Sequence, residues 1–422
     1  MSVLGVGPDL DTGRAEGAAA ALRSTSAVRE RAQQLLRRAR DGQSRWFSVD
    51  DDALQMAAAE VVDVTSVRYP DLKIPFHSRW RHLEAGGVDR RAELDARLAG
   101  LDAPARARAM IDLAVVSVLL DAGAGPDWRY HEEASGQSFT RSEGLGVASW
   151  HAVLGGLFSS DALHPLRVDA AGLHALSADR LAEAFQVGPA NPLVGLEGRM
   201  LVLHRLGEAL GAQPEVFGPH GRPGGLFDVL VPPGADLPTE TVAAHDILSQ
   251  LLLTLSGIWP ADNAISTQLL GDCWRHEAVR GPGLTDGWMP FHKLSQWLSY
   301  SLLEPFQWAG VQVVGLDALT GLPEYRNGGL LLDTGVLRLH DPAWAASSWT
   351  VDDELVVEWR ALTVALLDEL APLVRARLGV DADRMPLACV LEGGTWAAGR
   401  ALAQRARGGL PPLSIVSDGT VF

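Results

Sequence analysis

The chain has 422 residues, of which 47% are hydrophobic and 21% are charged, and its formal net charge is −16 at pH 7. This composition is typical of a folded globular protein and excludes a disordered chain. Because the basic residues are scattered through an acidic chain, we expect no nucleic-acid partner and no binding to an anionic membrane surface. The length is sufficient for a large buried core.

The two cysteines, Cys273 and Cys389, are too few and too far apart for a disulfide framework, which favours a reducing compartment. The opening stretch, "MSVLGVGPDLDTGRAEG", lacks the basic and apolar regions of a signal peptide. The longest apolar runs are too short to span a bilayer. We therefore expect a cytoplasmic protein, and no feature of the sequence assigns an oligomeric state.

Apolar residues at helical spacing dominate the chain. In chain order, the segments expected to form helices are 27–42, 105–125, 177–187, 199–212, 240–259 and 353–379. Gly42 suits the position after a helix C-terminus, Gly123 and Gly125 should stop the second helix, and Ser177 should cap the third. Strand patterns are fewer and cover residues 227–232, 311–316 and 413–422.

The sequence therefore predicts a mainly α fold, or an α+β fold with a few short strands. Connections rich in Gly and Pro are spread evenly, no long linker marks a boundary, and no repeat is present. We expect residues 1–422 to form a single, mainly helical catalytic unit. Its weakest join divides an N-terminal lobe, 1–165, from a C-terminal lobe, 166–422, which carries the candidate site.

Several common catalytic motifs are absent. The sequence contains no phosphate-binding loop, no G-x-S-x-G nucleophile elbow, no H-E-x-x-H and no paired C-x-x-C. The pairs His77/His82 and His131/Glu132 lack a third ligand at a diagnostic spacing, which favours structural roles over a metal site. We predict no metal and no cofactor.

The segment "DGWMPFHKLSQWLSYSLLEPF", residues 286–306, places many hydrogen-bonding groups among apolar residues. We expect one helix that starts near Pro290 and is ended or kinked by Pro305. One apolar stripe should face the core, and a neighbouring polar and aromatic stripe resembles a pocket wall; a water-facing stripe is the alternative. The candidate residues here are Asp286, Trp288, His292, Lys293, Gln296 and Trp297.

The segment "TGLPEYRNGGLLLDTGVL" should present Glu324, Tyr325 and Arg326 together at a turn or helix end, because Pro323 restricts the backbone before them. A carboxylate, a phenol and a guanidinium in succession can bind a polyol or stabilise developing charge. A Glu–Arg ion pair that caps a helix is the alternative. Asp333 is a further carboxylate on this segment.

A polar cluster also occurs in "YPDLKIPFHSRWRHLEAGGVDR". Its basic residues suit recognition of a phosphate or carboxylate on a small ligand, and a solvated basic face is the alternative. The cluster comprises Lys73, His77, Arg79, Arg81 and His82.

Long motifs throughout the chain resemble the Urg-three (uracil-regulatable gene product) family of uracil catabolism. These motifs are "IPFHSRWRHLEAGGVDR", "LLDAGAGPDWRY", "TRSEGLGVAS", "NPLVGLEGR", "DGWMPFHKLSQWLSYSLLEPF", "LPEYRNGGLLLDTGVL" and "EGGTWAAGR...SDGTVF". The resemblance implies a place in the URC route, which degrades uracil through its ribosyl nucleotide.

The segments "FHKLSQWLSYSL" and "LPEYRNGGLLLDTGVL" are also similar in order and spacing to two segments of the queuosine-salvage nucleoside glycosidases. That likeness implies a helical core like that of helix-hairpin-helix DNA glycosylases. In this chain His292 replaces a Tyr, Glu324 replaces an Asp, and Asn327-Gly328 replaces Val-Pro. Together the two resemblances imply hydrolysis of an N-ribosyl bond in a ring-opened uracil nucleoside or nucleotide such as ribosylurea.

This chemistry assigns a role to each candidate, since cleavage of an N-ribosyl bond builds positive charge on the sugar. Glu324 would stabilise that charge or activate water, and His292 is the first choice of general acid, with Asp333 and Asp286 in reserve. The expected partner is a small ribosyl substrate, contacted by Tyr325, Arg326, Gln296, Trp297 and Trp288, with Lys293 or the His77, Arg79 and Arg81 cluster at any phosphate.

Two other classes of function remain open. One is an amidase or ureide hydrolase that acts on the same intermediate and leaves the ribosyl bond intact. The other is a non-catalytic protein of the same pathway that binds a nucleotide.

Overall fold

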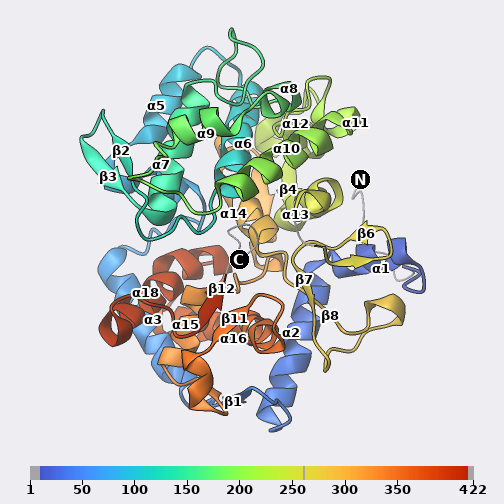
Figure 1. Ribbon diagram of the computed structural model, residues 1–422, viewed down its shortest axis with the longest axis vertical. Coiled ribbons are helices and arrows are strands. Elements are labelled where there is room, and N and C mark those ends of the chain that lie inside the picture. The colour runs from blue at the N-terminus through green and yellow to red at the C-terminus, as the bar shows by residue number, and fades with distance from the viewer. Residues whose placement is uncertain (1–9, 260–261, 417–422) are drawn as a thin grey trace. The chain divides into compact units, whose positions relative to one another are not determined.

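Helices make up most of the structure, and the strands are short and pair in twos (Figure 1). The computed structural model describes residues 10–259 and 262–416. The predicted mainly α fold is therefore confirmed.

The described chain forms two compact units, each assembled from separate stretches of sequence. Unit 1 contains residues 10–76, 262–293 and 316–416, and unit 2 contains residues 77–259 and 294–315. The lobe boundary expected after residue 165 lies inside unit 2, and the lobes stay a prediction.

Unit 1 is organised around one long helix, α16 (Glu354–Leu378, 25 residues), which packs against helices from distant parts of the chain. The other helices of unit 1 are α1 (Ala15–Leu22), α2 (Thr25–Arg40), α3 (Leu54–Arg68), α15 (Tyr325–Asp333), α17 (Leu387–Val390) and α18 (Trp396–Arg407). Its strands pair β1 (Phe47–Val49) with β10 (Leu337–Leu339), β5 (Ala264–Ile265) with β6 (Gln268–Leu269), β7 (Cys273–Arg275) with β8 (Trp288–Pro290), and β11 (Ser348–Thr350) with β12 (Ser414–Val416).

Small residues let α15 approach its neighbours closely. Gly328 faces α16, where the Trp359 indole nitrogen donates to its carbonyl at 3.1 Å. Gly399 of α18 lies so near α15 that a Cβ on it would stand 2.1 Å from the Arg326 carbonyl oxygen. A larger residue at either position would force the helices apart.

A single π-helical turn, Leu391–Thr395, joins α17 to α18. The Arg68 guanidinium of α3 donates to the carbonyl oxygens of Glu392 and Gly393 and to the Glu392 carboxylate. A π turn disturbs the regular ladder of helical hydrogen bonds, and Arg68 satisfies two carbonyl groups within it.

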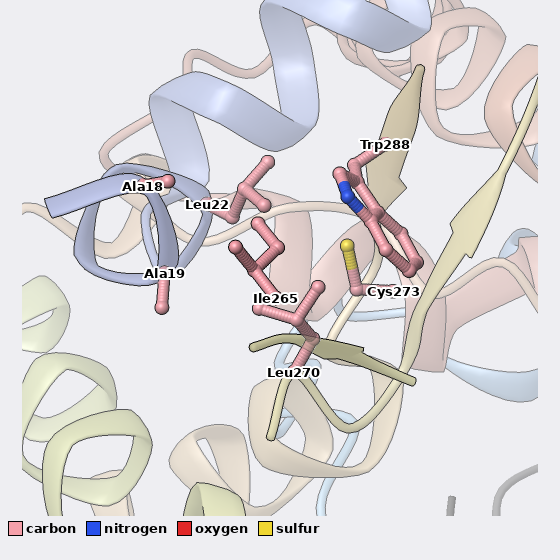
Figure 2. Close-up of a cluster of buried hydrophobic side chains, with 7 residues drawn as sticks. All are labelled: Ala18, Ala19, Leu22, Ile265, Leu270, Cys273 and Trp288. Carbon is pink, nitrogen blue, oxygen red and sulfur yellow. The ribbon is translucent and has the colours of Figure 1, made fainter. Parts of the chain in front are cut away.

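A small apolar cluster of unit 1 joins α1 to the β5–β8 region (Figure 2). Its side chains are buried and come from segments more than two hundred residues apart, so their burial fixes the N-terminal helix in unit 1. The cluster comprises Ala18, Ala19, Leu22, Ile265, Leu270, Cys273 and Trp288.

Unit 2 contains the remaining helices. These are α4 (Trp80–Leu83), α5 (Arg90–Arg97), α6 (Ala103–Leu119), α7 (Arg141–Leu154), α8 (Ala170–His174), α9 (Ala178–Ala184), α10 (Leu196–Gly211), α11 (Pro214–Phe217), α12 (Gly225–Leu230), α13 (Ala244–Leu255) and α14 (Lys293–Trp308), whose first residue belongs to unit 1. Its strands pair β2 (Tyr130–Glu132) with β3 (Gln137–Phe139) and β4 (Thr241–Ala243) with β9 (Gln312–Val314).

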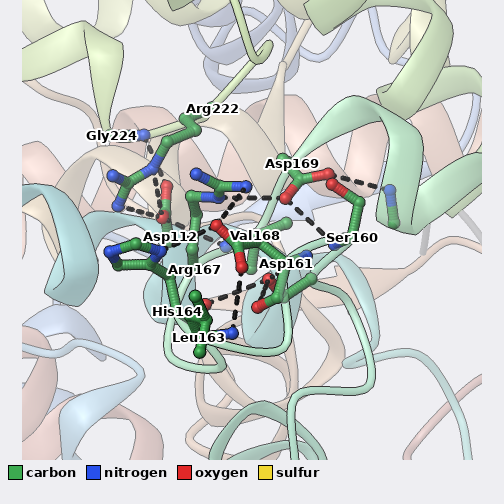
Figure 3. A network of polar contacts seen from close by, with 12 residues as sticks. Asp112, Ser160, Asp161, Leu163, His164, Arg167, Val168, Asp169, Arg222 and Gly224 are labelled. Carbon is green, nitrogen blue, oxygen red and sulfur yellow. Dashed lines mark hydrogen bonds and ion pairs between the residues drawn. The ribbon is translucent and has the colours of Figure 1, made fainter.

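A buried carboxylate on α6 holds two loops of unit 2 in place (Figure 3). Asp112 accepts from the backbone N–H groups of Val168 and Gly224 at 3.1 and 2.7 Å and pairs with Arg222 at 2.7 Å. Nearby, Asp169 caps α8 by accepting from the N–H of Gly172 at 2.9 Å. The loops leading into α8 and α12 are thereby fixed by charge-assisted hydrogen bonds.

Most predicted helices are confirmed. The segments appear as α2, α6, α9, α10, α13 and α16, with Ser177 accepting at the N-cap of α9. Helix α6 ends at Leu119, before the glycines expected to stop it. The strand at 311–316 is confirmed as β9, and the C-terminal strand covers Ser414–Val416, beyond which the prediction lies outside the described residues.

Two expectations about local structure are wrong. Residues 227–232 were expected as a strand but form most of α12, because Phe227 and Leu226 are buried in a short helix that packs on α6. The helix expected from Pro290 begins instead at Lys293, since Trp288–Pro290 pairs with β7. Pro305 lies inside α14 and does not end it.

In the part of the chain that the structure describes, no helix is both long enough and apolar enough to cross a membrane.

One buried ion pair of unit 2 should make stability depend on acid pH. Glu132 accepts from Arg90 at 2.9 and 2.6 Å, from Ser135 at 2.6 Å and from His151 at 2.7 Å. Burial tends to raise the pKa of Glu132, but these hydrogen bonds outweigh it and lower the pKa from its ordinary value of 4.5 to about 2. The stabilisation is present above pH 4.5 and is lost as the pH falls toward 2.

We therefore expect Glu132→Gln to lower the free energy of unfolding by about 2 kcal/mol or more near neutral pH. The difference from wild type should shrink as the pH falls below 4.5. Thermal unfolding followed by circular dichroism at a series of pH values measures both effects. The control Glu93→Gln removes a carboxylate whose ion pair with Arg97 is exposed, and it should change little. A difference between wild type and Glu132→Gln that is constant across this pH range would contradict the argument.

Candidate functional site

A buried ion pair between Asp272 and Arg360 organises the candidate site in unit 1. Asp272 precedes β7, Arg360 lies on α16, and the two are 88 residues apart in sequence. The guanidinium contacts both carboxylate oxygens, at 2.7 and 2.8 Å, and the two side chains are 6% and 1% exposed. Burial tends to raise the pKa of Asp272, but Arg360 and further donors lower it to about 2, so the carboxylate is ionised.

Asp272 also holds the start of α14. Its carbonyl oxygen accepts from the N–H groups of Phe291 and His292 at 2.9 and 3.1 Å. Its carboxylate accepts from the N–H of Lys293 at 2.9 Å and from the Trp274 indole at 2.7 Å. Three consecutive N–H groups are thus satisfied by one residue, which fixes the geometry at the N-terminus of the helix.

His292 adopts an unusual backbone conformation within this arrangement. Its φ of 51° lies in the left-handed region, which is uncommon for a residue other than glycine. The hydrogen bonds from Asp272 offset the cost of that conformation, which is of order 1–3 kcal/mol. Backbone strain that the surroundings maintain is frequent at functional sites.

The His292 ring is buried and neutral. Its Nε2 lies 3.0 Å from the Leu22 carbonyl oxygen, which can only accept, so Nε2 carries the proton. Burial lowers the pKa of His292, which disfavours the cationic form. Nδ1 is therefore the unprotonated nitrogen and can accept a proton.

Arg360 connects this segment to the second candidate segment. Its Nε donates to the Pro323 carbonyl oxygen at 3.3 Å, and its guanidinium lies 4.0 Å from the centre of the Phe291 ring. The start of α14 and the residue before Glu324 therefore share one buried guanidinium.

Glu324 is the N-cap of α15. Its two carboxylate oxygens accept from the N–H groups of Arg326 and Asn327 at 2.7 and 2.6 Å. A negative charge is stabilised at this end of a helix by the N–H donors and the helix dipole. The structure thus presents Glu324 at a helix start, as predicted, with its charge bonded to backbone groups.

The residues beside Glu324 carry polar atoms that remain unused. Arg326 is 3% exposed and donates from Nη1 to the Gly409 carbonyl oxygen at 3.2 Å, but its Nε has no hydrogen-bond partner among the described residues. The same holds for Oδ1 of the buried Asn327. Tyr325 is partly exposed, and the Arg326 guanidinium lies 4.7 Å from the centre of its ring. A buried donor and a buried acceptor without partners are what a ligand hydroxyl would satisfy.

The reserve carboxylates and Trp288 lie elsewhere in unit 1. Asp333 ends α15, roughly 13 Å along the helix from Glu324, and pairs with Arg407 at 2.6 Å. Asp286 is exposed and accepts from the N–H of Gly281 at 3.1 Å. Trp288 is buried in the cluster shown in Figure 2. The structure does not bring Asp333 together with Glu324.

The remaining candidates lie in unit 2, where Arg79 is the centre of a second polar cluster. Arg79 is fully buried, pairs with Asp121 at 3.1 Å and donates to Ser117 at 2.7 Å. Its guanidinium lies 5.7 Å from the centre of the Trp297 ring, and its Nη2 has no partner among the described residues. Gln296 is buried on the same helix as Trp297.

Arg81 and His77 differ from Arg79. Arg81 forms ion pairs of 2.7 Å with Glu84 and with the buried Glu304, so its charge is compensated by carboxylates. His77, the first residue of unit 2, is half-buried. Only Arg79 of these three therefore combines complete burial with an unused donor.

The structure places no candidate metal site in the described chain. No group of three or more His, Cys, Asp or Glu side chains with suitable placement occurs among residues 10–259 and 262–416. Of the pairs considered above, Glu132 is engaged with Arg90 and His151, and the His82 ring packs edge-on against Trp297.

Sequence reasoning missed Asp272 and Arg360. Arg360 is a single cation in the apolar run "ELVVEWRALTVALL" of a long helix, and a buried charge in such a run requires a charged partner. That pattern could have identified Arg360. The distant Asp272 carries no comparable pattern.

Comparison with known proteins places the chain in a family. A family model described as "Protein of unknown function (DUF1688)" matches residues 21–422. The chain is 38% identical over 434 residues to "Uracil catabolism protein 4" of Lachancea kluyveri, covering 95% of this chain and 98% of that protein. It is 39% identical over 411 residues to "Protein urg3" of Schizosaccharomyces pombe, covering 96% and 98%. The resemblance noted from the sequence is confirmed, and the chain belongs to the DUF1688 family together with these two proteins.

Proposed function

We propose that the protein acts in uracil catabolism as an N-ribosyl hydrolase. Its proposed substrate is a ring-opened uracil nucleoside or nucleotide such as ribosylurea. The metabolic setting is supported by the name of the full-length relative from Lachancea kluyveri. The chemistry is supported above all by the Asp272–Arg360 pair, which connects the start of α14 to Pro323, the residue before Glu324.

In the proposed reaction the bond between the ribose anomeric carbon and the urea nitrogen breaks. The hydroxide part of a water molecule adds to the carbon, and the urea nitrogen receives a proton. Positive charge develops on the sugar, and Glu324 would stabilise it or orient the water. Its position at a helix N-cap favours the ionised form that both roles require.

Proton transfer falls to the residues at the start of α14. With Nε2 bonded to Leu22, His292 can accept a proton at Nδ1 and so serve in a base or orienting role. Lys293, whose backbone Asp272 fixes, is then the cationic donor for the leaving urea. His292 stays the alternative acid if substrate binding protonates its ring.

The unused atoms next to Glu324 suit the ribose. A hydroxyl group can donate to Asn327 Oδ1 and accept from Arg326 Nε, and both atoms are buried. Tyr325, at the exposed edge, would cover the sugar.

Product analysis tests the proposal. Purified protein incubated with ribosylurea should release free ribose and urea, which nuclear magnetic resonance distinguishes from the substrate. Release of ammonia with an intact ribosyl bond would instead establish an amidase. Saturable binding without any product would establish a non-catalytic binding protein.

Glu324→Gln should lower turnover by roughly two orders of magnitude or more, because it removes the charge that stabilises the transition state. Glutamine can still accept one N–H bond at the cap, so the melting temperature should change little. The matched control is Asp102→Asn, which neutralises the N-cap of α6 in the same way and should retain full turnover. Near-normal turnover of Glu324→Gln would eliminate this assignment.

Arg360→Lys should separate positioning from binding. Lysine keeps the charge but cannot contact both Asp272 oxygens and the Pro323 carbonyl at once. We expect kcat to fall by about tenfold or more, with a smaller change in KM, because the two segments lose their shared anchor. The control on the same helix is Arg375→Lys, whose ion pair with Asp317 is partly exposed. Equal kinetics in the two variants would contradict a positioning role for Arg360.

A further inference from the structure

Two arginines of unit 1, Arg23 and Arg31, are hydrogen-bonded only to neutral oxygens. Arg23 follows α1 and donates from Nη2 to the Leu269 carbonyl oxygen at 2.8 Å. Arg31 of α2 donates from Nη2 to the Thr285 hydroxyl at 3.0 Å. Neither forms an ion pair with a carboxylate of residues 10–259 or 262–416, and the buried Nε of each has no hydrogen-bond partner there.

Burial makes this lack of a counter-charge costly. Arg31 is only 6% exposed, and isolated buried charges are strongly unfavourable unless they are paired. The carboxylates that act on it from a distance, Glu30 and Asp286, are both exposed and therefore screened by water. Burial lowers the pKa of both Arg23 and Arg31.

The other buried arginines of the protein differ. Arg360 contacts Asp272, Arg90 contacts Glu132, and Arg79 contacts Asp121. In each case a carboxylate on a neighbouring segment supplies the opposite charge. Arg31 therefore departs from the rule that the rest of the structure follows.

The two guanidinium groups surround a common point. Both act electrostatically on the Cys273 thiol, together with Arg275. Arg275 stacks on Trp288 with its guanidinium 3.8 Å from the ring centre. The Trp288 indole nitrogen also has no hydrogen-bond partner in the described chain, and Figure 2 shows Trp288 beside Cys273 and Leu22, the residue that precedes Arg23.

We propose that Arg23, Arg31 and the Trp288 indole form a binding site for the phosphate group of a small ligand. Three donors from separate segments suit a tetrahedral oxyanion, which accepts from several directions. The site lies next to the candidate catalytic residues in one respect, since Leu22 also accepts from His292. The inference does not depend on N-ribosyl hydrolysis and would hold for any phosphorylated ligand.

The test compares melting temperatures in inorganic phosphate and in sodium chloride of equal ionic strength. Wild type should show a saturable rise with phosphate, because a ligand that binds only the folded state stabilises it. Arg31→Met should melt at a higher temperature than wild type without phosphate, since it removes an uncompensated buried charge, and should respond to phosphate at least tenfold more weakly. Arg37→Met, an exposed position on the same helix, should behave as wild type.

Several results would overturn the proposal. One is a wild-type melting temperature that phosphate leaves unchanged relative to chloride. Another is an Arg31→Met protein that melts below wild type without phosphate, because the guanidinium would then be compensated within the protein. A third is folded Arg23→Gln that keeps full phosphate affinity, measured by isothermal titration calorimetry.

Two further ligands identify the source of the phosphate. Ribose 5-phosphate that binds at least tenfold more tightly than inorganic phosphate assigns the site to a phosphorylated sugar. Equal affinities assign it to free phosphate. Acetate that competes with phosphate at equal concentration would indicate a carboxylate site and contradict the proposal.

Discussion

The bidentate contact between Asp272 and Arg360 is the interaction on which the arrangement of unit 1 depends. It joins the long helix α16, the start of β7, the N-terminus of α14 and the turn before α15. Removing two charges from water is expensive, and the pair compensates through both guanidinium bonds and through the N–H groups that share the carboxylate. A hydrophobic pair could fill the same volume, but it could not orient three backbone segments at once.

The same device recurs elsewhere in the protein. Arg90 and Arg199 are fully buried and donate to carboxylates or to backbone carbonyl groups of separate segments. The guanidinium suits this use because it presents several donors in a fixed plane and keeps its charge. In a chain whose only lysines are Lys73 and Lys293, arginine therefore connects loops and helix ends throughout both units.

Sequence patterns predicted the helices well and the connections poorly. Helices α2 and α16 follow from the spacing of apolar residues, and α9 follows from its cap at Ser177, since both depend on neighbours within a few positions. The segment 227–232 was assigned as a strand because its apolar residues are too few to separate the two periods. Residues 288–290 form a strand only because β7 pairs with them, and nothing local encodes that partner.

The candidate site divides in the same way. The prediction that Glu324 stands at a helix start follows from Pro323 and is borne out by its N-cap geometry. The neutral ring of His292 depends on the Leu22 carbonyl, 270 residues away. The anchoring role of Asp272 likewise rests on a contact across 88 residues. Long-range partners of this kind determine which candidate carries charge, and the order of residues along the chain does not reveal them.

The π turn at Leu391–Thr395 has a consequence for how the family can vary in length. A π turn holds one residue more than the α-helical turn it replaces, and each residue rotates a helix by roughly 100°. Loss of a single residue there would restore regular α geometry but swing α18 around its axis, so that Gly399 would no longer face the Arg326 carbonyl. A bulkier side chain would then meet α15 beside Glu324. Related proteins should therefore tolerate insertions and deletions in the surface loops of this region but preserve the residue count between α17 and α18.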